Sequence, residues 1–212
     1  MQTIRPDATT TRTPSTSHGV LPAVNGQTTV HGCMSGTVPV SADFTECIAG
    51  SRGGDVLVVA LGDPGNTPNH DRNHIIRVCL SKNTSGGAVV GMICELRQSY
   101  VSETDLGTLV ASFLCSDISA TFGTYHRYRL TTGQAALITD YTALSLRFIT
   151  TNARGGATRT TRLHWAEVEL PENSESNVKD LKLSPTEAKR VRDGIAINQS
   201  VDRVAIGSSS PF

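Results

Sequence analysis

The fold is decided by residues 141–171, which read YTALSLRFITTNARGGATRTTRLHWAEVELP. Leu144, Leu146 and Phe148 stand at alternate positions, as in a strand with one buried face. A loop rich in asparagine and glycine follows, and residues 158–170 are then rich in β-branched side chains. The pattern predicts two long strands joined as a hairpin. Because an isolated hairpin is marginally stable in water, a second sheet is expected to cover it.

The rest of the chain repeats this kind of pattern in shorter pieces, separated by turn-rich segments. A helical turn is expected over residues 132–140, with Thr132 as its N-cap. Short strands at such regular intervals predict an all-β protein, an antiparallel β-sandwich of jelly-roll-like or Ig-like type. The predicted strands cover residues 38–40, 44–48, 55–62, 74–81, 88–98, 108–116 and 121–131.

The two ends differ from the middle in composition. Residues 1–30 are dominated by Thr, Ser, Pro, Gly and Gln without periodicity, which predicts an extended N-terminal arm. The sandwich is expected over residues 31–171. Residues 172–212 are predicted to form a C-terminal arm with one short helix at 185–193, because a capping-box sequence precedes that segment.

Charge and cysteine usage narrow the classes of function. The chain has 19 basic and 19 acidic residues, so it lacks the basic excess typical of nucleic-acid binders. The five cysteines show no metal-ligand spacing, which favours reduced thiols and synthesis in a cytoplasm. No secretory signal or apolar run long enough to span a bilayer is visible, so neither nucleic acid nor membrane is an expected partner.

Two motifs resemble catalytic or metal-binding arrangements. His70 and His74 flank Asp71, but nearby proline and glycine favour a loop, so no metal site is expected. Glu167 and Glu169 share one strand face at roughly 7 Å, a spacing that inverting glycosidases use. Same-face acids are also common on exposed strands, and the sequence orders no nucleophile, base and oxyanion donor together. The prediction is a non-enzyme without a cofactor.

Three aromatic residues form a candidate glycan platform: Tyr125, Tyr128 and Trp165. Sandwich proteins can bind sugars through exposed aromatic faces. The competing interpretation is that these side chains pack in the core or at the sandwich rim.

Several motifs between Arg77 and Pro171 resemble those of a known family. They include LRQ, an aspartate–isoleucine pair, TFGT, DYTALSLRF and WAEVELP, and the start IRPDATTT fits as well. On these motifs about half of the chain resembles the β-sandwich virion proteins of tailed bacteriophages, described as capsid decoration (cement), minor structural or tail proteins. The segments are residues 96–98, 117–118, 121–124, 140–148, 165–171 and 4–11.

The resemblance implies a component of a phage particle, made in the host cytoplasm, and fits a place on either the head or the tail. The head surface of the virion is the location expected under the leading hypothesis. The leading hypothesis is a cement protein that clamps neighbouring major capsid protein subunits and forms a symmetric homo-oligomer, a dimer or trimer. Its alternative is a tail or baseplate protein whose sandwich binds a host-surface glycan. The arms would contact the partner through apolar and basic side chains, namely Ile4, Arg5, Ile195, Ile197, Val201, Val204, Ile206 and Phe212.

Overall fold

The computed structural model describes most of the first 171 residues. The chain divides after Asn173, and the second unit, Ser174–Phe212, lies wholly outside the described residues. The predicted helix at 185–193 and the tail positions Ile195, Ile197, Val201, Val204, Ile206 and Phe212 therefore lie outside them too. The described residues are 2–13, 29–50, 53–69, 71–83, 90–116, 118–151 and 159–171.

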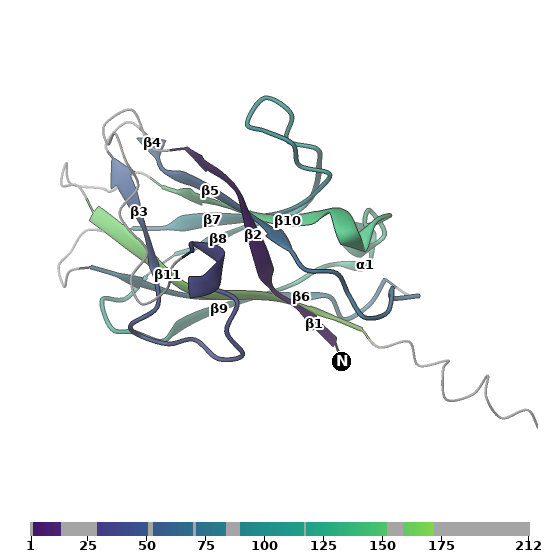
Figure 1. The fold of residues 1–212 in the computed structure, drawn as a ribbon, viewed down its shortest axis with the longest axis horizontal. Coiled ribbons are helices and arrows are strands. Elements are labelled where there is room, and N and C mark those ends of the chain that lie inside the picture. Colours follow the sequence, from purple (N-terminus) through teal and green to yellow (C-terminus); the bar gives the residue numbers. More distant parts are fainter. Residues whose placement is uncertain are drawn as a thin grey trace, which may run out of the picture. The chain divides into compact units, whose positions relative to one another are not determined.

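Two antiparallel sheets form the described part of the chain (Figure 1). Sheet A runs in the order β4 (Gly53–Gly54), β3 (Thr45–Gly50), β11 (Arg159–Leu170), β6 (Ile75–Lys82) and β9 (Thr124–Arg129), with β1 (Gln2–Ile4) also paired to β11. Sheet B runs in the order β2 (Pro6–Thr13), β5 (Val56–Leu61), β10 (Leu144–Thr150), β7 (Met92–Gln98) and β8 (Thr108–Cys115). The helical elements are short: η1 (His31–Cys33), α1 (Thr132–Ala135) and η2 (Tyr141–Ala143). The predicted all-β antiparallel sandwich is confirmed.

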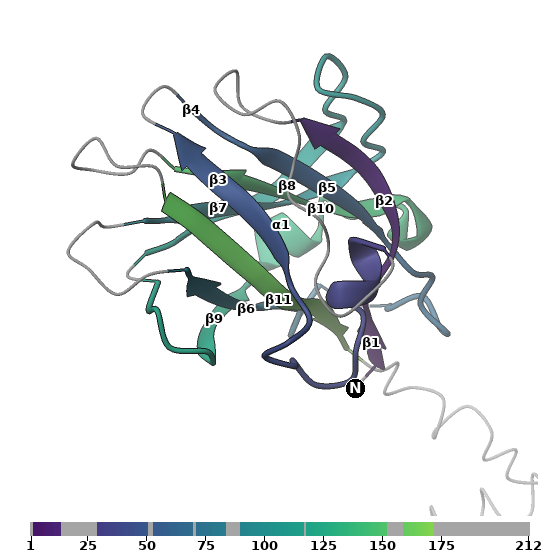
Figure 2. The same cartoon turned by 60° about the vertical axis from the view of Figure 1, so that its left-hand side comes forward.

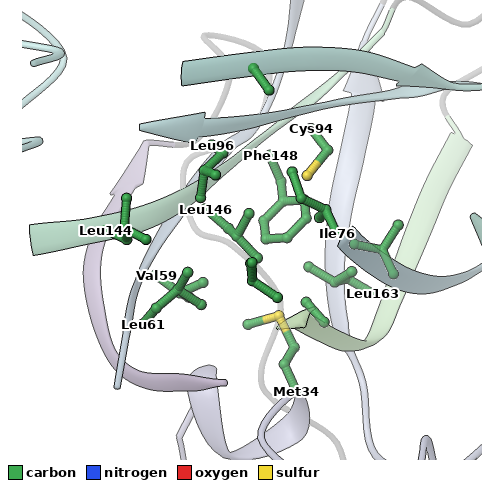
Figure 3. Packing of buried hydrophobic residues seen from close by; sticks show 14 of the residues in the cluster. Met34, Val59, Leu61, Ile76, Cys94, Leu96, Leu144, Leu146, Phe148 and Leu163 are labelled. Carbon is green, nitrogen blue, oxygen red and sulfur yellow. The ribbon is translucent and has the colours of Figure 1, made fainter. Parts of the chain in front are cut away.

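The core lies between the two sheets and is built mainly from aliphatic side chains. In β10, Leu144, Leu146 and Phe148 are almost completely buried, so the period-two pattern identified the inward face correctly. Figure 3 shows Ile76 and Leu163 of sheet A in the same cluster as these sheet B residues.

The predicted hairpin between residues 141 and 171 is wrong. Strand β10 pairs with β5 and β7 in sheet B, whereas β11 pairs with β1, β3 and β6 in sheet A. The chain therefore crosses from one layer to the other between these strands (Figure 2). Alternation shows that each strand has one apolar face. It does not show whether two successive strands belong to the same sheet or to opposite sheets.

The N-terminus also differs from the expectation of an extended arm. Residues 2–13 form β1 and β2, which pair with β11 and β5 respectively. Ile4 belongs to the core at 3% exposure, and the Arg5 side chain binds Glu167. Backbone hydrogen bonds to β11 and β5 order this segment, and a composition without hydrophobic periodicity does not reveal them. Ile4 and Arg5 are therefore not available to a partner in the way the arm interpretation required.

Two local predictions are corrected as well. Residues 38–40 form no strand, because Pro39 cannot donate to a ladder. The N-cap of α1 is Thr131, one residue before the predicted Thr132. Thr131 and Gln134 form a capping box, each side chain bonding the other residue's backbone N–H.

Candidate partner-binding surface

The outer face of sheet A, which points away from the core, carries several of the residues that the sequence singled out. Strands β11, β6 and β9 run side by side there, and their register sets cross-strand rows. One row is Trp165, Cys79 and Tyr125. The next row is Glu167, Arg77 and Arg127. Directly opposed residues share a face of a sheet, so these rows define one surface.

The two glutamates of β11 are engaged by arginines. Glu167 Oε2 accepts a hydrogen bond from Arg5 Nη2 at 3.0 Å, and its Oε1 lies 3.8 Å from Arg77 Nη1. Arg77 also forms an ion pair with Glu169. Both glutamates contact Arg77, so they share one face as predicted. Burial raises the pKa of Glu167, and the positive charges of Arg5 and Arg77 oppose that rise. The ion pair between Arg5 and Glu167 links the N-terminal segment to β11 of sheet A.

Trp165 and His164 hold the segment 31–44 against β11. Trp165 is 6% exposed, and its Nε1–H donates to the carbonyl oxygen of Gly36 at 2.8 Å. The register of β11 shifts between Leu163 and Trp165, so an irregularity at His164 lets both side chains contact this segment. Strand β11 therefore holds the segment 31–44 against the outer face of sheet A.

The His164 ring is itself enclosed by polar and aromatic partners. Its Nδ1 lies 3.1 Å from the carbonyl oxygen of Asp43, and its Nε2 lies 2.8 Å from Ser81 Oγ. The rings of Phe44 and Phe122 meet it edge-on, with centroids at 5.5 and 4.9 Å. Burial lowers the pKa of His164, which favours the neutral ring.

Four exposed apolar residues lie on the chain segments that meet at this buried cluster. They are Val38, Val40, Phe122 and Tyr125, whose side chains are between 39% and 65% exposed. Phe122 contacts the His164 ring, and the carbonyl oxygen of Val40 lies 3.3 Å from His164 Nδ1. Large apolar side chains grouped on a fixed surface are typical of a site that binds another molecule. We call these four residues the outer rim.

The predicted aromatic platform is not assembled as one surface. Tyr125 is 59% exposed on the outer face, but Tyr128 points to the other side of β9. There the Tyr128 ring stacks on Phe113 with centroids 4.8 Å apart. Trp165 is buried under the segment that includes Gly36. Packing at the core and rim, the competing interpretation, therefore describes Tyr128 and Trp165, and only Tyr125 of the three is open to solvent.

Sequence reasoning missed two members of the outer rim and misplaced a third. Val38 and Val40 were assigned to a strand, although Pro39 between them is a signal against one. A strand over residues 121–131 predicts Phe122 on the same face as Thr124, but β9 begins only at Thr124, so alternation does not extend back to Phe122.

The histidine motif does not form a metal site in the part that can be described. His70 lies outside the described residues, and His74 is fully buried with its Nε2 2.7 Å from Tyr141 Oη. Across the described ranges, no group of three or more His, Cys, Asp or Glu side chains is placed to hold a metal ion. All five cysteines are buried and none forms a disulfide, and burial raises the pKa of Cys115 to about 12.

A second polar network lies on the outer face of sheet B. Arg147 binds Glu103 through two hydrogen bonds of 3.0 and 2.6 Å and binds Glu95 at 3.0 Å. Arg97 donates to Glu95 at 2.8 Å and to the Leu106 carbonyl oxygen at 3.2 Å. The network fastens the loop between β7 and β8 to the sheet.

Among the described residues, no helix is long and apolar enough to cross a membrane. Comparison with known proteins gives no further likeness: no family model, curated protein or solved structure matches the chain.

Proposed function

We propose that this chain is a structural protein of a tailed-phage particle, a cement protein that binds the outer capsid surface and ties neighbouring major capsid subunits together. The observation that carries the proposal is the outer rim, a set of exposed apolar side chains on β9 and on neighbouring segments that hydrogen bonds and a ring contact hold against sheet A. The motif resemblance to phage virion proteins supplies the identity of the partner.

The proposed mechanism is multivalent attachment. A rigid sandwich contributes the outer rim, and residues 172–212 contribute a second contact on an adjacent subunit. Linking two weak contacts raises the effective concentration of the second, so the avidity exceeds either affinity alone. Because residues 2–13 belong to the sandwich, the proposed clamping role falls to the C-terminal segment.

The acidic pair supports a binding role over a hydrolytic one. In an inverting glycosidase one carboxyl must donate a proton and the other must activate water. Glu167 and Glu169 instead share Arg77 between them, and Glu167 also binds Arg5. Both carboxylates therefore form ion pairs that connect β11 to β6 and to the N-terminal segment.

A matched pair of substitutions tests the proposal. Val38, in the outer rim, is 65% exposed, and Val101, in the loop that follows β7, is 66% exposed. We expect Val38→Lys to weaken binding to capsids lacking this protein by about tenfold, or about 1.4 kcal/mol, as measured by co-sedimentation. Val101→Lys should bind like the wild type. Equal binding by all three proteins would refute the outer rim as the capsid contact.

A tail or baseplate protein that binds a host-surface glycan is the second candidate, favoured by the exposure of Tyr125 at the edge of the sheet. The variant Tyr125→Ala separates the two candidates when both capsid co-sedimentation and adsorption of particles to cells are measured. A cement protein predicts weaker capsid binding and unchanged adsorption of particles to cells. Loss of adsorption with unchanged capsid binding would favour the glycan-binding candidate.

A further inference from the structure

The sheet edges differ in how well they are protected against pairing with another strand. Unpaired edges attract further strands unless short length, charge, proline or irregularity prevents it. Within the described residues, β4 spans only Gly53–Gly54, and β9 carries Arg127 and Arg129 on its exposed side. The edge strand β2 begins with Pro6 and its register with β5 shifts twice. Each of these three edges has a feature that discourages pairing.

Strand β1 also pairs with one strand only, but it is short, Gln2–Ile4. The remaining edge, β8, lacks most of these protections. It reads TLVASFLC and contains no charged residue, proline or glycine. Its register with β7 shifts once, beside Val110, and residues 111–115 pair regularly after it. In the part of the chain that the structure describes, the β8 backbone pairs with β7 alone. The outer edge of β8 therefore offers a regular run of unpaired backbone groups.

An apolar row leads across sheet B to this edge. On the outer face Leu114 of β8 is 58% exposed and lies opposite Ile93 of β7. Ile93 lies opposite Ile149 of β10, which lies opposite Val56 of β5. A strand added to β8 would cover Leu114 and extend this row, burying apolar surface in addition to forming backbone hydrogen bonds.

We propose that β8 pairs antiparallel with β8 of a second copy of this chain, which joins the two B sheets into one continuous sheet. An uncharged strand can face its own copy without like-charge repulsion, whereas self-pairing of β9 would bring Arg127 and Arg129 close to their own copies. An antiparallel pair of identical strands is two-fold symmetric and therefore closes as a dimer. This dimer goes beyond the proposed attachment to a capsid and does not depend on it.

The alternation of side chains limits the possible registers of the pair, and we propose the one that centres the regularly paired run of β8. Side chains directly opposite each other in an antiparallel pair share a face, so the two-fold axis passes beside a residue that faces its own copy. Centring the regular run 111–115 places this axis at Phe113. Ser112 then lies opposite Leu114 of the second copy on the outer face, and two such pairs form per dimer.

Charged substitutions at these two exposed positions test both the edge and the register. The full-length chain and its variants are compared by sedimentation equilibrium over a range of concentrations, with circular dichroism to verify folding. We expect the wild type to form a dimer. The double variant Ser112→Lys, Leu114→Lys opposes lysine to lysine and should raise the dimer dissociation constant about tenfold or more.

The variant Ser112→Lys, Leu114→Glu is the decisive comparison, because it opposes lysine to glutamate in the same register and should dimerise more tightly than the double lysine variant. Val101→Lys adds a charge outside β8 and should leave the dimer unchanged. A monomeric wild type, or a dimer that survives the double lysine variant, would overturn the proposal. Equal loss of the dimer in both double variants would overturn the register centred on Phe113.

Discussion

Gly107 shows how one backbone position supports the loop between β7 and β8. Its φ is +59°, and an added Cβ would clash with the carbonyl oxygens of Gln98 and Ser99. We expect Gly107→Ala to lower the free energy of unfolding by about 2–3 kcal/mol, as measured by chemical denaturation. Gly133, inside α1, has nothing within 4 Å of an added Cβ. Gly133→Ala should therefore raise stability by about 0.5–1 kcal/mol, and a similar loss in both variants would contradict this account.

Glu103 makes the stability of the same loop depend on pH. The side-chain hydrogen bonds from Arg147 lower the pKa of Glu103, with a smaller contribution from Tyr100. Because the folded-state pKa lies below that of the unfolded chain, this stabilisation is complete above the unfolded value of about 4.3 and is lost as pH falls through the folded value. At pH near 7, Glu103→Gln should cost about 1–2 kcal/mol in urea denaturation.

The difference between Glu103→Gln and the wild type should shrink in acid, below the unfolded-state pKa of Glu103. Glu46→Gln serves as a control, since the Arg162–Glu46 pair is more exposed, with side chains at 34% and 21%. That substitution should cost less than about 1 kcal/mol. A Glu103→Gln effect that stayed constant between pH 7 and pH 3 would show that the carboxylate charge is not responsible.

At the scale of elements, the N-terminal strands belong to both sheets. Strand β1 joins sheet A and β2 joins sheet B, with Arg5 between them. Ile4 is 3% exposed within the core, so Ile4→Ala should lower the free energy of unfolding by about 2–4 kcal/mol. Thermal unfolding of this variant beside Val101→Ala, a truncation at an exposed site, measures the difference. Equal melting temperatures would restore the interpretation of residues 2–13 as an arm.

The sequence predicted individual elements better than their partners. Alternation located β5, β6, β7, β8 and β10 to within a few residues, because one face of each is apolar. It could not show that β10 and β11 lie in different sheets, since both arrangements bury the same faces. The shared face of Glu167 and Glu169 followed from their spacing, but their partner Arg5 did not. Arg5 lies 162 positions from Glu167, and only the pairing of β1 with β11 brings them together.

At the scale of the whole molecule, the outer faces of both sheets carry ion pairs. Arg77 and Glu167 on sheet A, and Arg147 and Glu95 on sheet B, are paired across neighbouring strands. The chain is neutral overall, with 19 residues of each sign. The four residues of the outer rim and the eight residues of β8 carry no charge, so the contacts proposed for both depend on shape and apolar area.

The position of β11 governs when this protein can fold during synthesis. Strand β11 lies inside sheet A, where it pairs with β1, β3 and β6, yet its residues are the last of the sandwich to leave the ribosome. Until then these strands lack their central neighbour, and their edges remain open to other nascent chains. Such long-range closure makes folding slow, in the millisecond-to-second range typical of all-β domains. A chain stalled before residue 159 would therefore expose an incomplete layer, a natural substrate for chaperones.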